Sequence, residues 1–208
     1  MFTGIVQGVA TVTSVIKRGD LVTWTVEFPH GALTGVALGA SISLDGCCLT
    51  VTTLPDDRHA AFDLVPETIA RTAFRGVKEG SVVNFERSLR FGDEIGGHLL
   101  SGHVDFVGRV SAVEVLDQSR VVTFSCEPAW TKYLFTKGYV ALNGTSLTLT
   151  HVDKKVGEFR VSLIPETLAK TTFGQAHVGT LINVEIDRTT QAIVETVERV
   201  MQEMESVG

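Results

Sequence analysis

The feature that most constrains the fold of this chain is an internal repeat with an offset of just under one hundred residues. The segment LVPETIARTAF at 64–74 returns 99 positions later as LIPETLAKTTF at 163–173, with seven of the eleven residues identical. Self-similarity at a fixed offset indicates a duplicated structural module. Three further matches keep the same order: DGCCLT at 45–50 with NGTSLT at 143–148, FTGIV at 2–6 with LSGHV at 100–104, and VNFE at 83–86 with INVE at 182–185.

The repeat also divides the chain. We expect one module over residues 1–97 and a second over 98–188, with the boundary near the flexible pair Gly96-Gly97. The segment 189–208 belongs to neither copy. A chain of 208 residues is long enough for two small domains of this size.

The local pattern within each copy predicts strands. Residues 11–16 and 21–28 alternate β-branched with polar side chains, as half-buried strands do. Many short strands separated by turns favour a small closed barrel, because closure leaves no exposed edge. Pro66 and Pro165 suit the first turn of one short helix in each copy. The fold class is therefore all-β, with tandem duplicated barrels.

An amphipathic α-helix is expected at the C-terminus, after residue 190. Its apolar side chains recur at helical spacing and have no evident partner elsewhere in the chain. They are Ile193, Val194, Val197, Val200, Met201 and Met204.

Composition excludes several classes of function. The net charge of −6, with no basic stripe, argues against a nucleic-acid partner. We expect no membrane partner, because no apolar run approaches the length of a membrane span, and the N-terminus does not resemble a signal peptide. Three cysteines (Cys47, Cys48 and Cys126) without CxxC spacing fit neither a disulfide framework nor a metal site. A cytoplasmic protein with free thiols is the expectation.

Positions where the two copies differ are candidates for divided chemistry. Four stand out within otherwise matched segments: Cys48 against Ser146, Ile5 against His103, Phe2 against Leu100, and Ser41 against Tyr139.

Cys48 and His103 each allow two interpretations. Cys48 is a nucleophile or acid–base group if its thiolate is stabilised, and otherwise a small buried hydrophobe. His103 follows Gly102, which lets the backbone approach a ligand, so it is either a proton shuttle or a structural residue at a barrel rim. His98 is interpreted as structural, at the junction. The remaining histidines have no acidic or cysteine neighbours and are read as surface or scaffold residues, so no metal site can be assembled.

Two further features are open to both a binding and a structural interpretation. The Pro-Glu-Thr segments offer backbone N–H groups, with Glu67 and Glu166, either to a ligand or to simple capping of the helix; binding is slightly favoured. Asp187 is either the N-cap of the terminal helix or a carboxylate of the site, and the cap is favoured.

Taken together, the motifs resemble those of the riboflavin synthase family. They are MFTGIV at 1–6, DGCCLT at 45–50, EIGGHLLSGH at 94–103 and IPET at 164–167. The resemblance implies two six-stranded Greek-key barrels and a C-terminal helix through which three chains associate. Each active site would lie between the N-terminal barrel of one subunit and the C-terminal barrel of another. Two molecules of 6,7-dimethyl-8-ribityllumazine would exchange a four-carbon unit there, without metal or cofactor.

The same resemblance assigns site residues. Of the catalytic candidates, Phe2 would stack on a ring, Cys48 would act on C7 of a bound lumazine, and His103 would move protons; Asp187 completes the set. The N-terminal pocket would use Gly4, Ile5, Val6, Ser41, Cys48, Leu49, Thr50, Asp63, Leu64, Val65, Pro66, Glu67 and Thr68. The C-terminal pocket would use Gly102, His103, Val104, Ser146, Leu147, Thr148, Ser162, Leu163, Ile164, Pro165, Glu166 and Thr167, with Lys137 reaching across the subunit interface.

Two alternatives stay open at this level. One is a non-catalytic carrier of lumazine or flavin, which is disfavoured because both halves keep their pocket motifs. The other is a flavin-reductase-like barrel, which is disfavoured because no nicotinamide-binding domain follows. Neither the roles of donor and acceptor nor covalent action by Cys48 can be assigned from the sequence.

Overall fold

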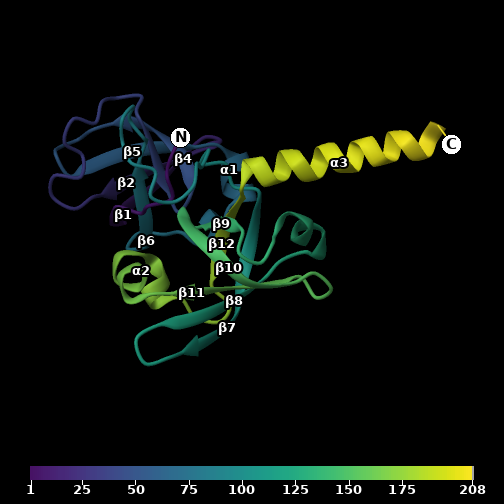
Figure 1. The fold of residues 1–208 in the computed structure, drawn as a ribbon. Coiled ribbons are helices and arrows are strands. Elements are labelled where there is room, and N and C mark those ends of the chain that lie inside the picture. Colours follow the sequence, from purple (N-terminus) through teal and green to yellow (C-terminus); the bar gives the residue numbers. More distant parts are fainter. Residues whose placement is uncertain (208) are drawn as a thin grey trace.

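The computed structural model describes residues 1–207, so Gly208, the last residue of the expected C-terminal segment, lies outside it. The chain forms two closed antiparallel barrels of six strands each, followed by a long helix that projects away from both (Figure 1). The strands of the first barrel, here called the N barrel, are β1 (Gly8–Arg18), β2 (Leu21–Glu27), β3 (Ser41–Leu44), β4 (Cys47–Thr53), β5 (His59–Leu64) and β6 (Val82–Arg87). Those of the second, the C barrel, are β7 (Phe106–Val115), β8 (Arg120–Ser125), β9 (Tyr139–Leu142), β10 (Thr145–Asp153), β11 (Glu158–Leu163) and β12 (Leu181–Ile186).

Both barrels have the same topology. The strand order around the N barrel is β1-β2-β5-β4-β3-β6, and the C barrel repeats it with β7-β8-β11-β10-β9-β12. Strands β3, β4 and β5 follow one another by short connections, and β6 returns beside β3, which is a Greek-key arrangement. The expected tandem barrels are confirmed.

Alternation along the strands builds one core inside each barrel. In β4, Cys47, Leu49 and Val51 point inward and are buried, while Thr50 and Thr52 point outward. This is the period of two that a pleated strand imposes. Phe62 in the N barrel and Phe159 in the C barrel are fully buried within their separate cores.

The helices begin where the sequence predicted them. Both α1 (Pro66–Arg71) and α2 (Pro165–Lys170) start at the repeated proline, and each runs into a short 3₁₀ turn: η1 (Ala73–Gly76) and η3 (Thr172–Gln175). A third 3₁₀ turn, η2 (Pro128–Tyr133), and the long helix α3 (Arg188–Val207) belong to the C-terminal half. No helix within the described residues is long and apolar enough to cross a membrane.

The barrels meet through reciprocal contacts that approximate a twofold axis. Asn84 donates its side-chain amide to the carbonyl of Asn143, and Asn183 donates to the carbonyl of Asp45, both at 2.9 Å. The same side chains accept the backbone N–H groups of Thr172 (2.8 Å) and Ala73 (2.7 Å). Because every contact occurs twice, the two copies of the module face each other in equivalent orientations.

Candidate active site

The candidate site of the N barrel lies on the outer face of β3, β4 and β5. Ser41 pairs with Thr50 across β3 and β4, and Cys48 lies two residues before Thr50 on the same face. On β5, Asp63 also points outward and accepts a hydrogen bond from Thr23 Oγ1 at 2.7 Å. Cys48 is a free cysteine and is half-buried, because it packs against the small apolar cluster of Phe2, Leu100 and Ala141.

The C barrel carries the matching face. Tyr139 pairs with Thr148 across β9 and β10, and Ser146 occupies the position of Cys48. Ser162 and Ile164 are exposed at the end of β11, as Asp63 and Val65 are at the end of β5. The structure thus brings most of the predicted pocket residues together on two equivalent surfaces.

Four predicted pocket residues have side chains that point the other way. Leu49, Leu147, Leu64 and Leu163 are buried in the barrel cores, with at most 9% of each residue exposed. Strand alternation requires this, because their neighbours on either side face outward. A contact between these four leucines and a ligand can therefore involve only the backbone.

A second correction concerns the glycine segments, which the structure exchanges between the barrels. The carbonyl of Gly102 accepts the N–H of Cys48 at 2.7 Å, and the carbonyl of Gly4 accepts the N–H of Ser146 at 2.8 Å. Val104 packs against the core of the N barrel. Segment 100–104 thus lies against Cys48, and segment 2–6 against Ser146, the reverse of the predicted grouping. We call these two stretches the crossing segments.

Glycine is required where the crossing segments pass over the strands. Gly4 and Gly102 have φ values of 76° and 78°, in the left-handed region. A Cβ at Gly4 would lie 2.5 Å from Cβ of Ser146, and one at Gly102 would lie 2.6 Å from Cβ of Cys48. The two glycines therefore allow the crossing segments to contact Ser146 and Cys48, the matched residues that differ between the two barrels.

A buried glutamate anchors each crossing segment. Glu86 on β6 accepts hydrogen bonds from the backbone N–H (2.6 Å) and hydroxyl (2.7 Å) of Thr3 and from the N–H of Gly4 (3.0 Å). Glu185 on β12 accepts the equivalent bonds from Ser101 (2.7 Å each) and Gly102 (3.0 Å). Burial raises the pKa of both carboxyl groups, although these hydrogen bonds act in the opposite direction.

The C barrel pocket contains a histidine that the sequence interpretation treated as structural. His98 Nδ1 lies 2.6 Å from Ser146 Oγ, and its ring stacks on Tyr139 with centroids 5.3 Å apart. Its Nε2 is buried and has no hydrogen-bond partner within residues 1–207. Burial lowers the pKa of His98, while the nearby Asp187 opposes that shift, so the ring is neutral at pH 7. An offset of 98 carries His98 to a position before residue 1, so comparison of the two copies offers no residue to set against it.

The four predicted catalytic residues have different environments. Phe2 is only 1% exposed and pairs with Leu100, so its ring offers no open face in this chain for the predicted stacking. Cys48 is half-buried, whereas His103 is exposed. Asp187 caps α3, as the favoured interpretation expected: it accepts from Thr190 N at 3.0 Å and Thr190 Oγ1 at 2.7 Å. Burial opposes its ionisation, but these bonds outweigh that effect and lower the pKa of Asp187.

The helix starts do not show side-chain capping, which was the less favoured of the two interpretations of the Pro-Glu-Thr segments. Neither Val65 nor Ile164, the N-cap residues, has a side-chain cap, and Glu67 instead pairs with Arg71 at 2.8 Å on the surface. Among the described residues, no group of three or more potential ligands could hold a metal ion. One histidine does have an acidic neighbour, contrary to expectation: His59 Nδ1 lies 2.8 Å from a carboxylate oxygen of Asp56 in an exposed turn.

These features define a class of protein: a tandem Greek-key barrel protein with two related surfaces on one chain. A family model described as the lumazine-binding domain matches it twice, over residues 3–88 and 101–187. The riboflavin synthase of Escherichia coli is 42% identical over 207 residues, covering 99% of this chain and 96% of that protein. The riboflavin synthase of Buchnera aphidicola from Schizaphis graminum is 42% identical over 203 residues, covering 97% and 96%.

Solved structures agree with these sequence matches. LumP complexed with riboflavin superimposes with a TM-score of 0.83 at 25% identity, covering 90% of this chain and all of LumP. LumP complexed with 6,7-dimethyl-8-(1'-D-ribityl) lumazine, at 24% identity, has a TM-score of 0.81 over the same shares and supports the fold. The chain belongs to the lumazine-binding domain family and, within it, to the riboflavin synthases.

Proposed function

We propose that the chain converts two molecules of 6,7-dimethyl-8-ribityllumazine into riboflavin and 5-amino-6-(D-ribitylamino)uracil by transfer of a four-carbon unit. The observation that carries this proposal is the pair of matched surfaces on one chain, around Cys48 and Ser146. Two copies of one substrate need two related pockets. Holding both in a fixed orientation removes much of the entropic barrier of a bimolecular reaction.

The chemistry requires little beyond alignment, a base and a nucleophile. The C7 methyl group of the lumazine is acidic because its carbanion delocalises into the pteridine ring. Cys48, the free thiol on the outer face of the N barrel, is assigned to C7 of the lumazine bound there. No metal or cofactor enters these steps.

Proton transfer in the C barrel pocket is assigned to His98 together with Ser146, in addition to the predicted His103. A neutral imidazole within hydrogen-bond distance of a hydroxyl can accept its proton. Asp187 supports this role at longer range, since its charge favours the protonated form of His98. Tyr139 holds the ring by stacking.

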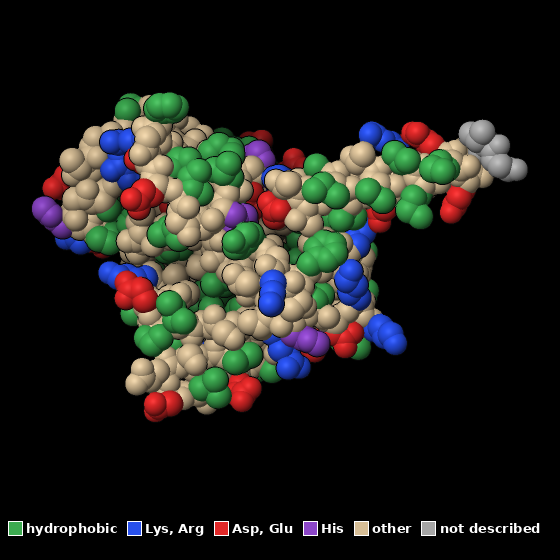
Figure 2. All heavy atoms as spheres, viewed as in Figure 1, with side chains coloured by type: hydrophobic (Ala, Val, Ile, Leu, Met, Phe, Trp, Pro, Cys, Tyr) green, Lys and Arg blue, Asp and Glu red, His purple; other side chains and the backbone are tan. Residues whose placement is uncertain are grey.

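We further propose that α3 joins three chains, so that each site forms between an N barrel and the C barrel of a neighbour, with Lys137 reaching across. The base of the helix is held by Lys132 and Tyr133, which contact Glu198 (2.6 Å) and Glu195 (3.0 Å). Apolar side chains elsewhere on the helix remain exposed: Ile193, Val197, Val200, Met201 and Met204. Figure 2 shows hydrophobic side chains along the projecting helix.

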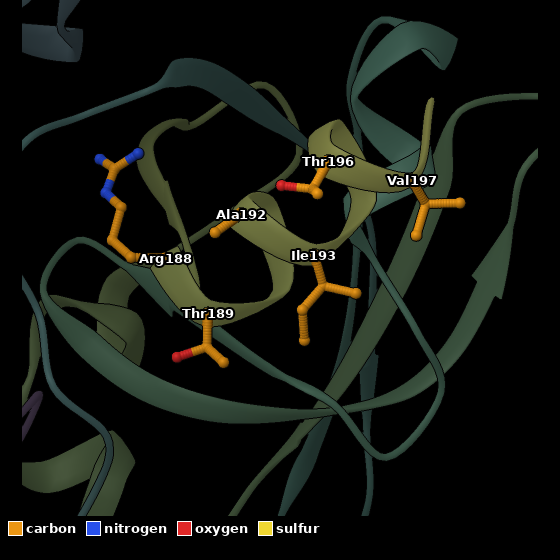
Figure 3. Close-up of a pocket in the computed structure, with 6 residues that line it drawn as sticks. All are labelled: Arg188, Thr189, Ala192, Ile193, Thr196 and Val197. Atoms are coloured by element: carbon orange, nitrogen blue, oxygen red, sulfur yellow. The ribbon is translucent and has the colours of Figure 1, made fainter. Parts of the chain in front are cut away.

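An open, nearly flat surface lies along the first turns of this helix. Figure 3 shows its lining residues, which come from successive turns of α3: Arg188, Thr189, Ala192, Ile193, Thr196 and Val197. An exposed apolar stripe of this kind is typical of a surface that another helix covers. Val194 is the exception, because it packs against the core of its own C barrel.

The remaining assignments follow the same model. The chain is divided into lumazine-binding barrels over 1–97 and 98–188, and a C-terminal trimerisation helix and tail over 189–208. The three free cysteines are compatible with the proposed cytoplasmic location.

The test of the function is incubation of the pure protein with 6,7-dimethyl-8-ribityllumazine alone. We expect riboflavin absorbance to appear, with one riboflavin formed for every two lumazines consumed. Binding of the lumazine without product would establish a carrier instead. Oxidation of added NADH in the presence of flavin would favour the flavin-reductase alternative.

Sedimentation of the wild type and of the double variant Val197→Glu/Met201→Glu tests the oligomer. We expect a trimer for the wild type, and a monomer with little activity for the variant. A fully active monomer would contradict sites that lie between chains.

A further inference from the structure

The two crossing segments raise the question of which residues determine the position of Cys48. The Cys48 N–H donates to the carbonyl of Gly102 at 2.7 Å, and Gly102 belongs in sequence to the second copy. The N–H of Gly102 is in turn held at 3.0 Å by Glu185, a residue of β12 in the C barrel. A chain of hydrogen bonds therefore runs from the C barrel to the candidate nucleophile of the N barrel.

This series of hydrogen bonds has little room to adjust. Glu185 is 2% exposed and uses both carboxylate oxygens on the segment, one for the N–H and hydroxyl of Ser101 and one for Gly102. Bonds to an ionised acceptor are shorter and stronger than neutral ones, so they fix the orientation of the two peptide planes. A single added carbon at Gly102 would lie 2.6 Å from Cβ of Cys48 and 2.8 Å from the ring of Phe2.

The first residue of α3 reinforces the same segment. Arg188 Nη2 donates to the carbonyl of His103 at 2.8 Å, and Arg188 Nη1 contacts Asp105 Oδ1 at 2.8 Å. Arg188 Nε also lies 4.0 Å from Glu185 Oε1. The crossing segment over Cys48 is thus held from β12 and from the start of the helix. The segment over Ser146 has Leu89 at the position that matches Arg188.

We propose that Glu185 is a positioning residue for Cys48 and that Glu86 is one for Ser146, so that each barrel sets the geometry of the reactive residue in the other barrel of its own chain. The importance of this arrangement for turnover rests on the proposed function. The placement of Cys48 does not depend on the proposed function, and it can be measured without substrate.

The chain provides its own matched control. Glu86 and Glu185 are similarly buried, make the same three hydrogen bonds and occupy equivalent strands. Glutamine preserves the shape of the side chain but presents an N–H₂ group to at least one of the donors, so one or more of the bonds is lost. Glu185→Gln and Glu86→Gln should therefore reduce stability to a similar extent while acting on different pockets.

The experiment measures the rate at which iodoacetamide modifies Cys48 in the full-length protein, with the modified peptides resolved by mass spectrometry. In Glu185→Gln we expect the rate at Cys48 to rise by on the order of tenfold, because Gly102 no longer stays in place over Cys48. In Glu86→Gln the rate should stay within about twofold of the wild type, because the loosened segment lies over Ser146. Cys47, which is buried, serves as the internal reference.

Equal acceleration in both variants would overturn the proposal, since it would indicate general loosening. An unchanged rate in Glu185→Gln would also overturn it. If Glu185→Gln does not fold, Ser101→Ala removes a single hydrogen bond from the same carboxylate, with Thr3→Val as its matched control. The same asymmetry is then expected with a smaller amplitude, and its absence would contradict the proposal.

Discussion

The N and C barrels are alike in their scaffolds and unlike at their pockets. Their β-bulges fall at equivalent positions: Val12/Ser14 corresponds to Val110/Ala112, and Val51/Thr53 to Leu149/His151. The glutamate anchors also match within 0.1 Å in each bond. Around the reactive positions, by contrast, the side chains diverge, with Cys48 in one barrel and Ser146 in the other. The comparison shows that the duplicated scaffold is the same in both barrels while the residues at the two matched surfaces differ.

Exchange of the two reactive residues should produce the largest effect. Cys48→Ser is expected to lower the rate of riboflavin formation by on the order of 10²-fold, because an alcohol is a much weaker nucleophile than a thiol at neutral pH. Ser146→Cys should cost about tenfold or less, since it weakens a hydrogen bond to His98 without removing the imidazole. Steady-state rates of both variants provide the measurement. Equal losses would mean that the pockets do the same chemistry.

Removal of His98, the histidine beside Ser146, should have the next largest effect. His98→Gln is expected to lower the rate by about tenfold, as loss of a positioned proton acceptor does. Burial lowers the pKa of His98, so the ring stays neutral at pH 7 and is protonated only at more acidic pH. The wild-type rate should therefore fall only at pH values below the ordinary pKa range of histidine, and this limb should be absent in the variant. An identical pH profile for both proteins would remove His98 from the chemistry.

The hairpin turns at the barrel interface differ by a single titratable group. Asp45 and Asn143 occupy equivalent turns, with φ values of 42° and 44°, and their side chains accept the N–H of Asn84 and Asn183 at 2.8 Å. Burial raises the pKa of Asp45 to about 7, although the bond from Asn84 acts against this. The folded protein therefore retains a proton that the unfolded chain releases near pH 4.

This difference predicts a pH-dependent stability. The stabilising contribution of protonated Asp45 is fully present below the unfolded pKa and is lost as the pH rises from about 4 to about 7. Asp45→Asn should remove this contribution to the slope and be more stable than the wild type by about 1 kcal/mol at pH 8, the full shift being reduced because the turn is partly open to solvent. Asn143→Asp should steepen the slope. Urea unfolding at pH 4.5, 6 and 8 measures both variants, and parallel curves for all three proteins would contradict the assignment.

The smallest effect is expected at Lys137 in the C barrel, whose equivalent in the N barrel is a glycine, Gly39. Lys137 has a φ of 68°, in the left-handed region, and its N–H bonds to Leu149 at 2.7 Å; the equivalent Gly39 has a φ of 81° and bonds to Val51 at 2.9 Å. Lys137→Gly should raise the free energy of unfolding by roughly 0.5 kcal/mol, because relief of the strained backbone exceeds the added entropy of the unfolded chain.

Gly39→Lys, the reciprocal change, should destabilise the protein by about 1 kcal/mol. If Lys137 binds substrate across the subunit interface, Lys137→Gly should also raise KM. A variant that is neither more stable nor weaker in binding would show that this lysine is an incidental difference between the copies.

The fold was largely predictable because its determinants are local or repeated. Alternation over 11–16 and 21–28 predicted strands, the repeated prolines at 66 and 165 marked helix starts, and the spacing of apolar residues after 190 predicted α3. Comparison of the copies also singled out Cys48 and Ser146. It could not reveal His98, because an offset of 98 carries that residue to a position before residue 1.

The exchange of the crossing segments could not be read from the repeat either. Alignment of the copies assigns Gly4 to the barrel of Cys48 and Gly102 to that of Ser146, while the hydrogen bonds join them the other way. In a symmetric duplication both pairings are consistent with the same sequence pattern. Only the docking of one barrel on the other decides between them.

The sequence by itself determined that this chain has two copies of one barrel, which strand faces are buried, and which positions differ between the copies, because periodicity and self-similarity are properties of the chain alone. The tertiary structure decided which segment covers which pocket, that His98 joins Ser146, and that Asp45 carries a raised pKa. Each of these three features depends on burial and on contacts between residues far apart in sequence. The burial and the contacts are established only when the two barrels pack together.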